Sequence, residues 1–292
     1  MGLSGVPTRV WKALVGIAVI LLVAVVALDQ WQARRGEASL FGLSWPGRPP
    51  AAPAAISARA LPDASTAPLG PGAPRIAVIV DDLGGRRDVF ELVRAIQRPV
   101  AVAVLPALPL TQVIGREAAG AGLEVLLDLP MEPYRYPEID PGPGALLMSM
   151  SPGELQTAVR RHLAALPGAV GVVNHLGSRL TEDRARMRAL VEVLGARRLF
   201  LVDAYASNLS LAYSEARELG VRAARRQVVI DHTAGEAAAR ARWDEVAGWA
   251  DRRGEVVVIA HGHPLTVRLL REYIPRWEAR GLRLVPVSEL AR

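Results

Sequence analysis

The chain of 292 residues contains no cysteine. This absence excludes thiolate metal sites, disulfide frameworks, cysteine nucleophiles and a lipidated N-terminal cysteine. The sequence also has no glycine-rich GxGxxG or Walker loop and no GxSxG elbow. We therefore expect no nucleotide cofactor, and serine nucleophile chemistry is disfavoured.

Lysine is almost absent, because Lys12 is the only one, and arginine carries the remaining positive charge. The formal net charge of +6 could indicate a nucleic-acid-binding protein. However, the arginines after residue 74 are interspersed with Asp and Glu and form no basic stripe interleaved with aromatic residues. Such a pattern is typical of a solvated surface, and we predict no nucleic-acid partner.

Residues 13–28 are apolar or glycine and carry no charge, and Trp11 and Trp31 flank them. With these tryptophans at the two interfaces, the segment is long enough to cross a bilayer. We predict a signal anchor over residues 1–35 with a transmembrane helix at about 11–31. A cleaved signal peptide is the alternative.

Residues 36–74 are rich in Pro, Ala, Gly and Ser and cannot bury enough apolar surface to fold, so they are predicted to be a disordered linker. Arg9 and Lys12 precede the apolar segment and favour a cytoplasmic N-terminus. The sequence therefore predicts a single-pass inner-membrane anchor with a domain at residues 75–292 in the periplasm or outside the cell.

From Arg75 onwards, short β-branched runs alternate with longer amphipathic segments. The predicted strands are 76–81, 100–105, 123–129, 169–174, 199–203, 227–231, 255–260 and 282–287. The predicted helices lie near 86–97, 111–121, 152–165, 183–195, 208–219, 236–253 and 265–280. Continuous apolar strands indicate burial on both faces, as in parallel sheets. We predict an α/β fold, a distorted or incomplete (β/α) barrel of seven to eight mostly parallel strands, with an open doubly wound sheet as the alternative.

Carboxylates and histidines gather at the ends of the predicted strands, where parallel barrels place their sites. These residues are Asp81, Asp82, Asp128, Glu132, His175, Asp203, Asp231, His232, His261 and His263, and Asn174 and Ser178 lie beside them. The remaining histidine, His162, lies in a predicted helix and is expected to be a surface residue.

The adjacent Asp81 and Asp82 are the strongest single signal, because a buried pair of like charges needs a cation or a shared proton. Side-chain alternation is expected to split the pair, so that one carboxylate binds a metal and the other contacts water or backbone. The residue types predict a mononuclear site with mixed oxygen and nitrogen ligands for a divalent metal, with Zn²⁺ as the first choice.

Six segments in this order resemble the divergent polysaccharide deacetylases, distant relatives of the NodB-type carbohydrate esterases. They are IAVIVDDLG, LDLPMEP, GVVNHLGSRLTED, LFLVDAYASNLSLAYSEARELGV, RRQVVID and IAHGHPLTVRLL. The resemblance covers about residues 75–292 and implies a distorted (β/α) barrel. It also implies that Asp81 is the catalytic base, that Asp82 and His175 are metal ligands, and that His261 is the general acid.

The remaining candidates are predicted to contact substrate: Glu132, Asn174, Ser178, Asp203, Asp231 and His263. The deacetylase pattern has a second histidine four residues after the first, and here that position is Arg179. The third metal ligand is therefore unassigned, and the candidates are His261, Asp203, Asp231 and Glu132. Asp128 and His232 also differ from the residues that the family pattern has at their positions.

The resemblance implies a metal-dependent hydrolase that removes acetyl groups from an envelope or extracellular polysaccharide. The incomplete metal triad keeps an alternative open, a catalytically inactive barrel that binds glycan or a protein partner in the cell envelope. Metal-dependent hydrolysis of an amide or phosphoester is a third possibility.

Overall fold

The computed structural model describes residues 72–292. The predicted anchor at residues 1–35, its transmembrane segment at 11–31 and all but the end of the linker at 36–74 lie outside the described residues. Within the part of the chain that is described, no helix is both long enough and apolar enough to cross a membrane.

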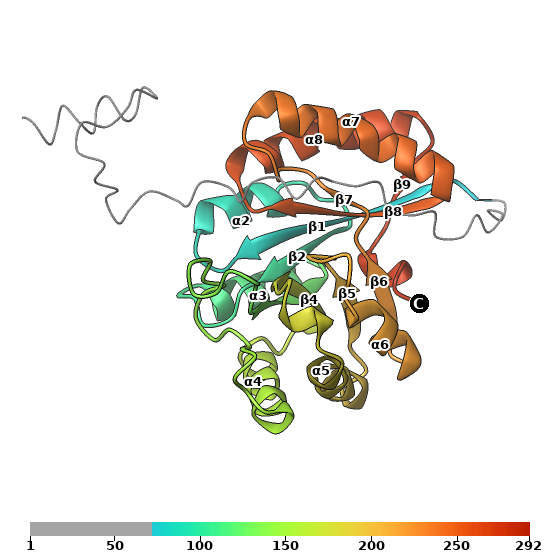
Figure 1. Ribbon diagram of the computed structural model, residues 1–292. Coiled ribbons are helices and arrows are strands. Elements are labelled where there is room, and N and C mark those ends of the chain that lie inside the picture. The colour runs from blue at the N-terminus through green and yellow to red at the C-terminus, as the bar shows by residue number, and fades with distance from the viewer. Residues whose placement is uncertain (1–71) are drawn as a thin grey trace, which may run out of the picture. The chain divides into compact units, whose positions relative to one another are not determined.

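The described residues form a curled α/β fold around one parallel sheet (Figure 1). The strands are β1 Arg75–Leu83, β2 Val100–Val104, β3 Val125–Met131, β4 Ala169–Leu176, β5 Phe200–Asp203, β6 Ala223–Arg225, β7 Val228–Val229, β8 Glu255–His261 and β9 Arg283–Leu284. Their order is β6-β5-β4-β3-β2-β1-β8-β7, and β9 pairs with the first residues of β1. Since β6 and β7 form the two ends of this order, the barrel is incomplete, as predicted.

The helices cover the outside of the curled sheet (Figure 1). They are α2 Arg87–Arg94, α3 Thr111–Gly120, α4 Pro152–Ala165, α5 Arg184–Ala196, α6 Ala212–Glu218, α7 Glu236–Arg253 and α8 Pro264–Ala279, and short 3₁₀ turns lie at Leu180–Glu182 and Val287–Glu289. Every predicted helix is present. The predicted strands 227–231 and 282–287 are shorter than expected, and β6 was not predicted.

Alternate residues of each strand face two different apolar clusters. In β1, Val78 and Val80 pack against the helices, whereas Ala77 and Ile79 belong to a smaller cluster on the inner face of the curled sheet. C-terminal residues from Val285 onwards join the inner cluster. Because side chains alternate with a period of two, every second residue of a strand faces the inner side. The inner cluster therefore shows which residues at the carboxyl end of each strand face inward.

The prediction that His162 is a surface residue is wrong, because its side chain in α4 is only 4% exposed. Its ring Nε2 donates to the carbonyl of Gly144 at 2.8 Å. Gly144 has φ +81, and a Cβ there would lie 2.6 Å from the His162 ring. Burial lowers the pKa of His162 from its ordinary value of 6.5. The imidazole is therefore a neutral anchor for the loop between β3 and α4.

This anchor predicts a pH-dependent contribution to stability. A depressed pKa in the folded state means that the unfolded chain takes up the proton first, so stability is full above about 6.5 and falls below it. The expected slope is at most about 1.4 kcal/mol per pH unit. Urea unfolding of wild type and His162→Gln between pH 5 and 8 should show their stability difference shrinking as the pH falls. The exposed His232→Gln is the control. The prediction would be contradicted if the difference in stability between wild type and His162→Gln did not change with pH, or if His232→Gln showed the same change.

Candidate metal centre

The carboxyl end of β1 places two neighbouring carboxylates on the same side of the sheet. Asp81 continues the inward series of Ala77 and Ile79, and it is the register partner of His261 on β8. Asp82 has φ +58, and the β1–β2 register shifts between Val80 and Leu83. This bulge redirects Asp82, so the expected split of the pair by alternation is wrong: both carboxylates reach one cluster with His261.

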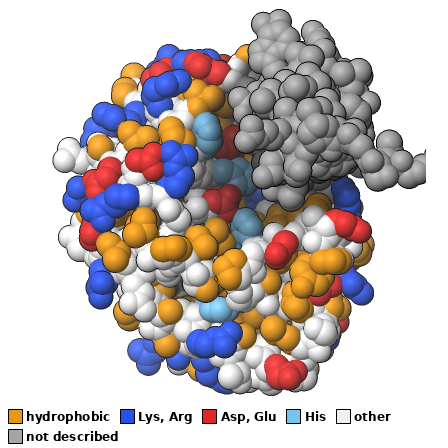
Figure 2. All heavy atoms as spheres, turned by 90° about the vertical axis from the view of Figure 1, so that its left-hand side faces the viewer, with side chains coloured by type: hydrophobic (Ala, Val, Ile, Leu, Met, Phe, Trp, Pro, Cys, Tyr) orange, Lys and Arg blue, Asp and Glu red, His pale blue; other side chains and the backbone are white. Residues whose placement is uncertain are grey.

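Two overlapping groups of possible metal ligands lie at this end of the sheet. Asp82, Asp128 and His175 can each offer a ligand atom within 4.8 Å of the others, and so can Asp81, Asp82 and His261. Asp82 belongs to both groups. Figure 2 looks onto this side of the fold, and pale-blue histidine and red carboxylate side chains gather near the centre of the face.

The first group is held together by β1, β3 and β4. Nδ1 of His175 lies 2.9 Å from Oδ1 of Asp82 and 3.9 Å from Oδ2 of Asp128. The backbone N–H of Asp82 donates to Oδ2 of Asp128 at 3.0 Å, which fixes the bulged residue against β3. The first group therefore combines two carboxylates with one imidazole.

His261 is oriented by a second carboxylate on the neighbouring strand. Its Nδ1 lies 2.7 Å from Oδ1 of Asp231, which also accepts from the His261 backbone N–H at 3.1 Å. The hydroxyl of Thr266 donates to the other oxygen of Asp231 at 2.6 Å. Since Nδ1 is engaged, Nε2 is the ring nitrogen that is free to face the cluster. Asp231 therefore positions His261, a role that differs from the predicted substrate contact.

Burial and mutual charge shift the ionisation of the cluster. Burial raises the pKa of Asp81 well above its ordinary value, and it raises that of Asp128 to about 6. Burial alone would lower the pKa values of the two histidines, but the neighbouring carboxylates raise that of His175 to about 9 and that of His261 to about 10. Burial would also raise the pKa of Asp82, but the contact with His175 outweighs burial, and the pKa of Asp82 is lowered. Among residues 72–292, the two histidines are the ion-pair partners of the carboxylates in this site.

The residues present fit a divalent cation. Among the described residues, Oδ1 of Asp81 and Oδ1 of Asp128 are buried and have no hydrogen-bond partner. A buried, unpaired carboxylate oxygen is unfavourable unless a cation or a proton satisfies it. Carboxylate oxygens and an imidazole nitrogen are ligands that Zn²⁺ and similar ions accept.

Asp128 is the residue that the sequence analysis missed as a third ligand candidate. Its side chain points inward from β3, as does its neighbour Leu126, and it is 0% exposed. The available signal was a carboxylate inside an otherwise apolar strand. Arg179, at the position of the absent second histidine, turns to Glu132 instead and donates to it at 2.8 Å. Glu132 also accepts from the backbone N–H of Met148. It therefore holds the loop between β3 and α4 in place.

Three further predicted substrate contacts lie around the site with defined partners. Asn174 is 2% exposed and bridges the Leu176 carbonyl and the Ala204 N–H. The hydroxyl of Ser178 accepts from the Tyr134 backbone N–H. His263 is exposed and caps α8 by accepting from Leu265. The predicted substrate roles of Ser178 and His263 stay predictions, whereas burial assigns Asn174 a structural role.

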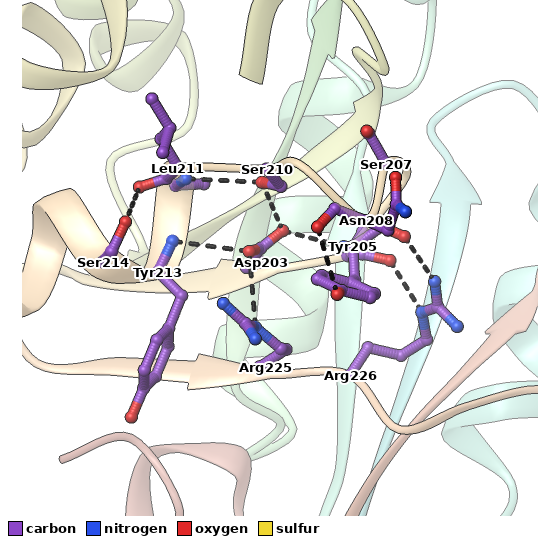
Figure 3. A network of polar contacts seen from close by, with 12 residues as sticks. Asp203, Tyr205, Ser207, Asn208, Ser210, Leu211, Tyr213, Ser214, Arg225 and Arg226 are labelled. Carbon is purple, nitrogen blue, oxygen red and sulfur yellow. Dashed lines mark hydrogen bonds and ion pairs between the residues drawn. The ribbon is translucent and has the colours of Figure 1, made fainter. Parts of the chain in front are cut away.

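Asp203 lies apart from both ligand groups. Its neighbour Val202 faces the inner cluster, so alternation points Asp203 outward, where it is 0% exposed. Figure 3 shows its carboxylate at the centre of the loop after β5. It accepts from the N–H groups of Tyr205 and Tyr213 and from the hydroxyl of Ser210. Asp203 therefore braces this loop, and the structure does not support its predicted contact with substrate.

Arg225 closes the same network from β6. Its Nε lies 3.7 Å from Oδ2 of Asp203, and its guanidinium packs over the rings of Tyr205 and Tyr213, with 4.6 and 4.9 Å to their centroids. Arg226 donates to the carbonyls of Ala204 and Tyr205 (Figure 3). The two arginines thereby join β6 to the loop beside the site.

The fold and the cluster together define an incomplete (β/α) barrel protein with a candidate metal centre at the carboxyl ends of its strands. The family model of the divergent polysaccharide deacetylases matches residues 78–291. The chain belongs to this family, which confirms the resemblance inferred from its sequence.

Three similar proteins are described as uncharacterized. The chain is 31% identical over 202 residues to YibQ of Escherichia coli, covering 69% of this chain but only 63% of YibQ, so it spans less than two thirds of that relative. It is 28% identical over 197 residues to a Haemophilus influenzae protein, covering 68% and 70% of the two chains. A crystal structure from Agrobacterium tumefaciens matches with a TM-score of 0.69 at 24% identity, covering 77% and 92%, which shows a shared fold.

The Asp203 network predicts a large and local stability effect. Asp203→Ala would leave the N–H groups of Tyr205 and Tyr213 without their buried acceptor and Arg225 without its ion-pair partner. We expect a loss of about 3 kcal/mol in the free energy of unfolding, measured by urea titration. The control is Asp251→Ala, which removes an exposed ion pair with Arg280 and should cost less than about 1 kcal/mol. Equal effects of the two changes would contradict the structural role of Asp203.

Proposed function

We propose that this protein is a metal-dependent hydrolase that removes acetyl groups from an envelope or extracellular polysaccharide. The observation that carries the proposal is the cluster of Asp82, Asp128 and His175 beside a buried carboxylate, Asp81, and an oriented imidazole, His261. Membership of the divergent polysaccharide deacetylase family supports a carbohydrate substrate. A membrane-anchored position, with the domain in the periplasm or outside the cell, is part of the same proposal.

Asp82, Asp128 and His175 would hold the cation, for which zinc is the first choice. When bound, such an ion supplies a Lewis acid that polarises an acetyl carbonyl and makes a water molecule more acidic. Asp82 is fixed by its backbone contact with Asp128, and His175 by its contact with Asp82. These contacts preorganise the ligand atoms, which is what a metal site requires of its protein.

Asp81 and His261 would move the protons. Oδ1 of Asp81 has no hydrogen-bond partner among residues 72–292, so it is free to accept a proton from the attacking water. Nε2 of His261 would donate a proton to the departing amine or alcohol, and Asp231 keeps that ring in the required orientation. The two groups are register partners on adjacent strands, which places base and acid on the same side of the sheet.

The loops around the site offer a surface for a sugar chain. Tyr134 is 59% exposed, yet its hydroxyl contacts Glu182 and its backbone N–H donates to Ser178. An exposed ring that is held in place can pack against the apolar face of a pyranose at little entropic cost. Ser178, predicted from the sequence to contact substrate, would support this ring.

Acetate release tests the proposal. The purified full chain, loaded with Zn²⁺, Co²⁺ or Ni²⁺, should release acetate from acetylated chitooligosaccharides or peptidoglycan fragments. Asp81→Asn and His261→Gln should lower kcat by about 10²- to 10⁴-fold, the range that a general base or acid contributes. His232→Gln, an exposed control, should leave kcat unchanged.

A chain that binds these glycans but releases no acetate with any of the three metals would overturn the proposal. That result would favour the alternative, a catalytically inactive barrel that binds glycan in the cell envelope. Folding of each variant is checked by circular dichroism and thermal unfolding, so that loss of structure is not mistaken for loss of catalysis.

A further inference from the structure

The second ligand group has the features of a cation site in its own right. Asp81, Asp82 and His261 can each offer a ligand atom within 4.8 Å of the others, with Asp82 shared between the two groups. Asp81 is 7% exposed, and its Oδ1 has no hydrogen-bond partner in the described part of the chain. This oxygen is a buried, unpaired acceptor that belongs to the second group and not to the first.

The orientation of His261 also fits a metal ligand. Histidines that bind metals commonly donate their other ring N–H to a carboxylate, which fixes the tautomer and the ring plane. His261 has this arrangement, since its Nδ1 contacts Asp231 and Asp231 is held in turn by Thr266. The same contact that would make His261 a general acid therefore leaves Nε2 as the ring nitrogen available to a cation.

The carboxylates of the whole cluster have few cationic partners. The cluster contains the carboxyl groups of Asp81, Asp82, Asp128 and Asp231. Among residues 72–292, their only ion-pair partners within 4 Å are the two histidines of the site. A cation held by the first group would leave Asp81, with its unpaired Oδ1, outside its ligand set.

The two groups differ in accessibility. In the first, the side chain of Asp128 is 1% exposed and that of His175 is 20% exposed. In the second, the side chain of His261 is 40% exposed. A more solvated ligand competes with water for the ion, so the second group should bind its cation more weakly than the first.

We propose that the site holds two divalent cations that share Asp82, and that the weaker one, on Asp81 and His261, inhibits the enzyme. Carboxylates commonly bridge pairs of metal ions about 3.5–4 Å apart in proteins. The inhibition rests on the proposed function, because the second ion would occupy the groups assigned as base and acid. The stoichiometry does not depend on that function.

Metal binding to the purified full chain tests the stoichiometry without any substrate. Equilibrium dialysis against Zn²⁺, read by mass spectrometry of the metal, should give two ions per chain in two steps. His261→Gln and Asp128→Asn should each leave one ion, the first removing the weaker step and the second the tighter one. Asp82→Asn should remove both, and the control His232→Gln should keep both. A wild-type stoichiometry of one, or two ions retained in His261→Gln, would overturn the proposal.

Sharing of Asp82 has a spectroscopic signature. With Mn²⁺ in place of Zn²⁺, the fully loaded protein should show an exchange-coupled electron paramagnetic resonance spectrum, whereas His261→Gln should show that of an isolated ion. Two uncoupled Mn²⁺ ions in the wild type would contradict the bridge. Thermal unfolding of each apo variant confirms that it is folded.

The inhibitory role is tested by acetate release as Zn²⁺ is raised through the two binding steps. The rate should rise with the first step and fall at least about 10-fold with the second. A rate that rises with the second step, or is insensitive to it, would overturn the inhibitory role. Two bound ions without acetate release at any concentration would defeat the proposed function and the inhibition while leaving the two-ion site intact. One bound ion together with acetate release would overturn the two-ion site and leave the proposed function intact.

Discussion

The site depends on the two-residue alternation of a parallel sheet that is buried on both faces. In β1, β3, β4 and β8 the same inward series that supplies the inner apolar cluster ends in Asp81, Asp128, His175 and His261. No loop needs to fold over the site to bring these four side chains together. The strands position them as rigidly as they position the core, which suits chemistry that tolerates little displacement.

Asp82 is the exception to this alternation, and the exception brings its carboxylate into the candidate metal centre. A regular strand would turn its carboxylate toward the helices. The bulge and its positive φ turn it inward, at a backbone cost of about 1–3 kcal/mol for a non-glycine residue. The hydrogen bond from its N–H to Asp128 and the contact with His175 offset part of that cost. Gly262, directly after β8, permits the arrangement, because a Cβ there would lie 2.8 Å from the Asp81 carbonyl.

The sequence predicted the helices, the parallel barrel and the gathering of polar residues, because helical periodicity and strand ends leave clear patterns. It could not predict which strand-end residues face inward. Strands apolar on both faces carry no alternation, so nothing in the sequence separates outward Asn174 and Asp203 from inward His175 and Asp128. One known contact in each strand, such as that of Val202 on the inner face, would have shown which of its alternate residues face inward.

The proposed set of metal ligands differs from the deacetylase pattern in one residue, and this difference would change the electrostatics of the site as well as its geometry. The deacetylase pattern of the NodB-type esterases has a second histidine where this chain has Arg179, and that arginine pairs with Glu132 instead. In the proposed metal centre Asp128 would take the place of that histidine, so a carboxylate would replace a neutral imidazole. The site thereby gains one negative charge in a buried environment, where an uncompensated charge is expensive. In the proposed two-cation site, ionised Asp128 would strengthen the attraction for the first cation, while the unpaired Oδ1 of Asp81 would stay available to the second.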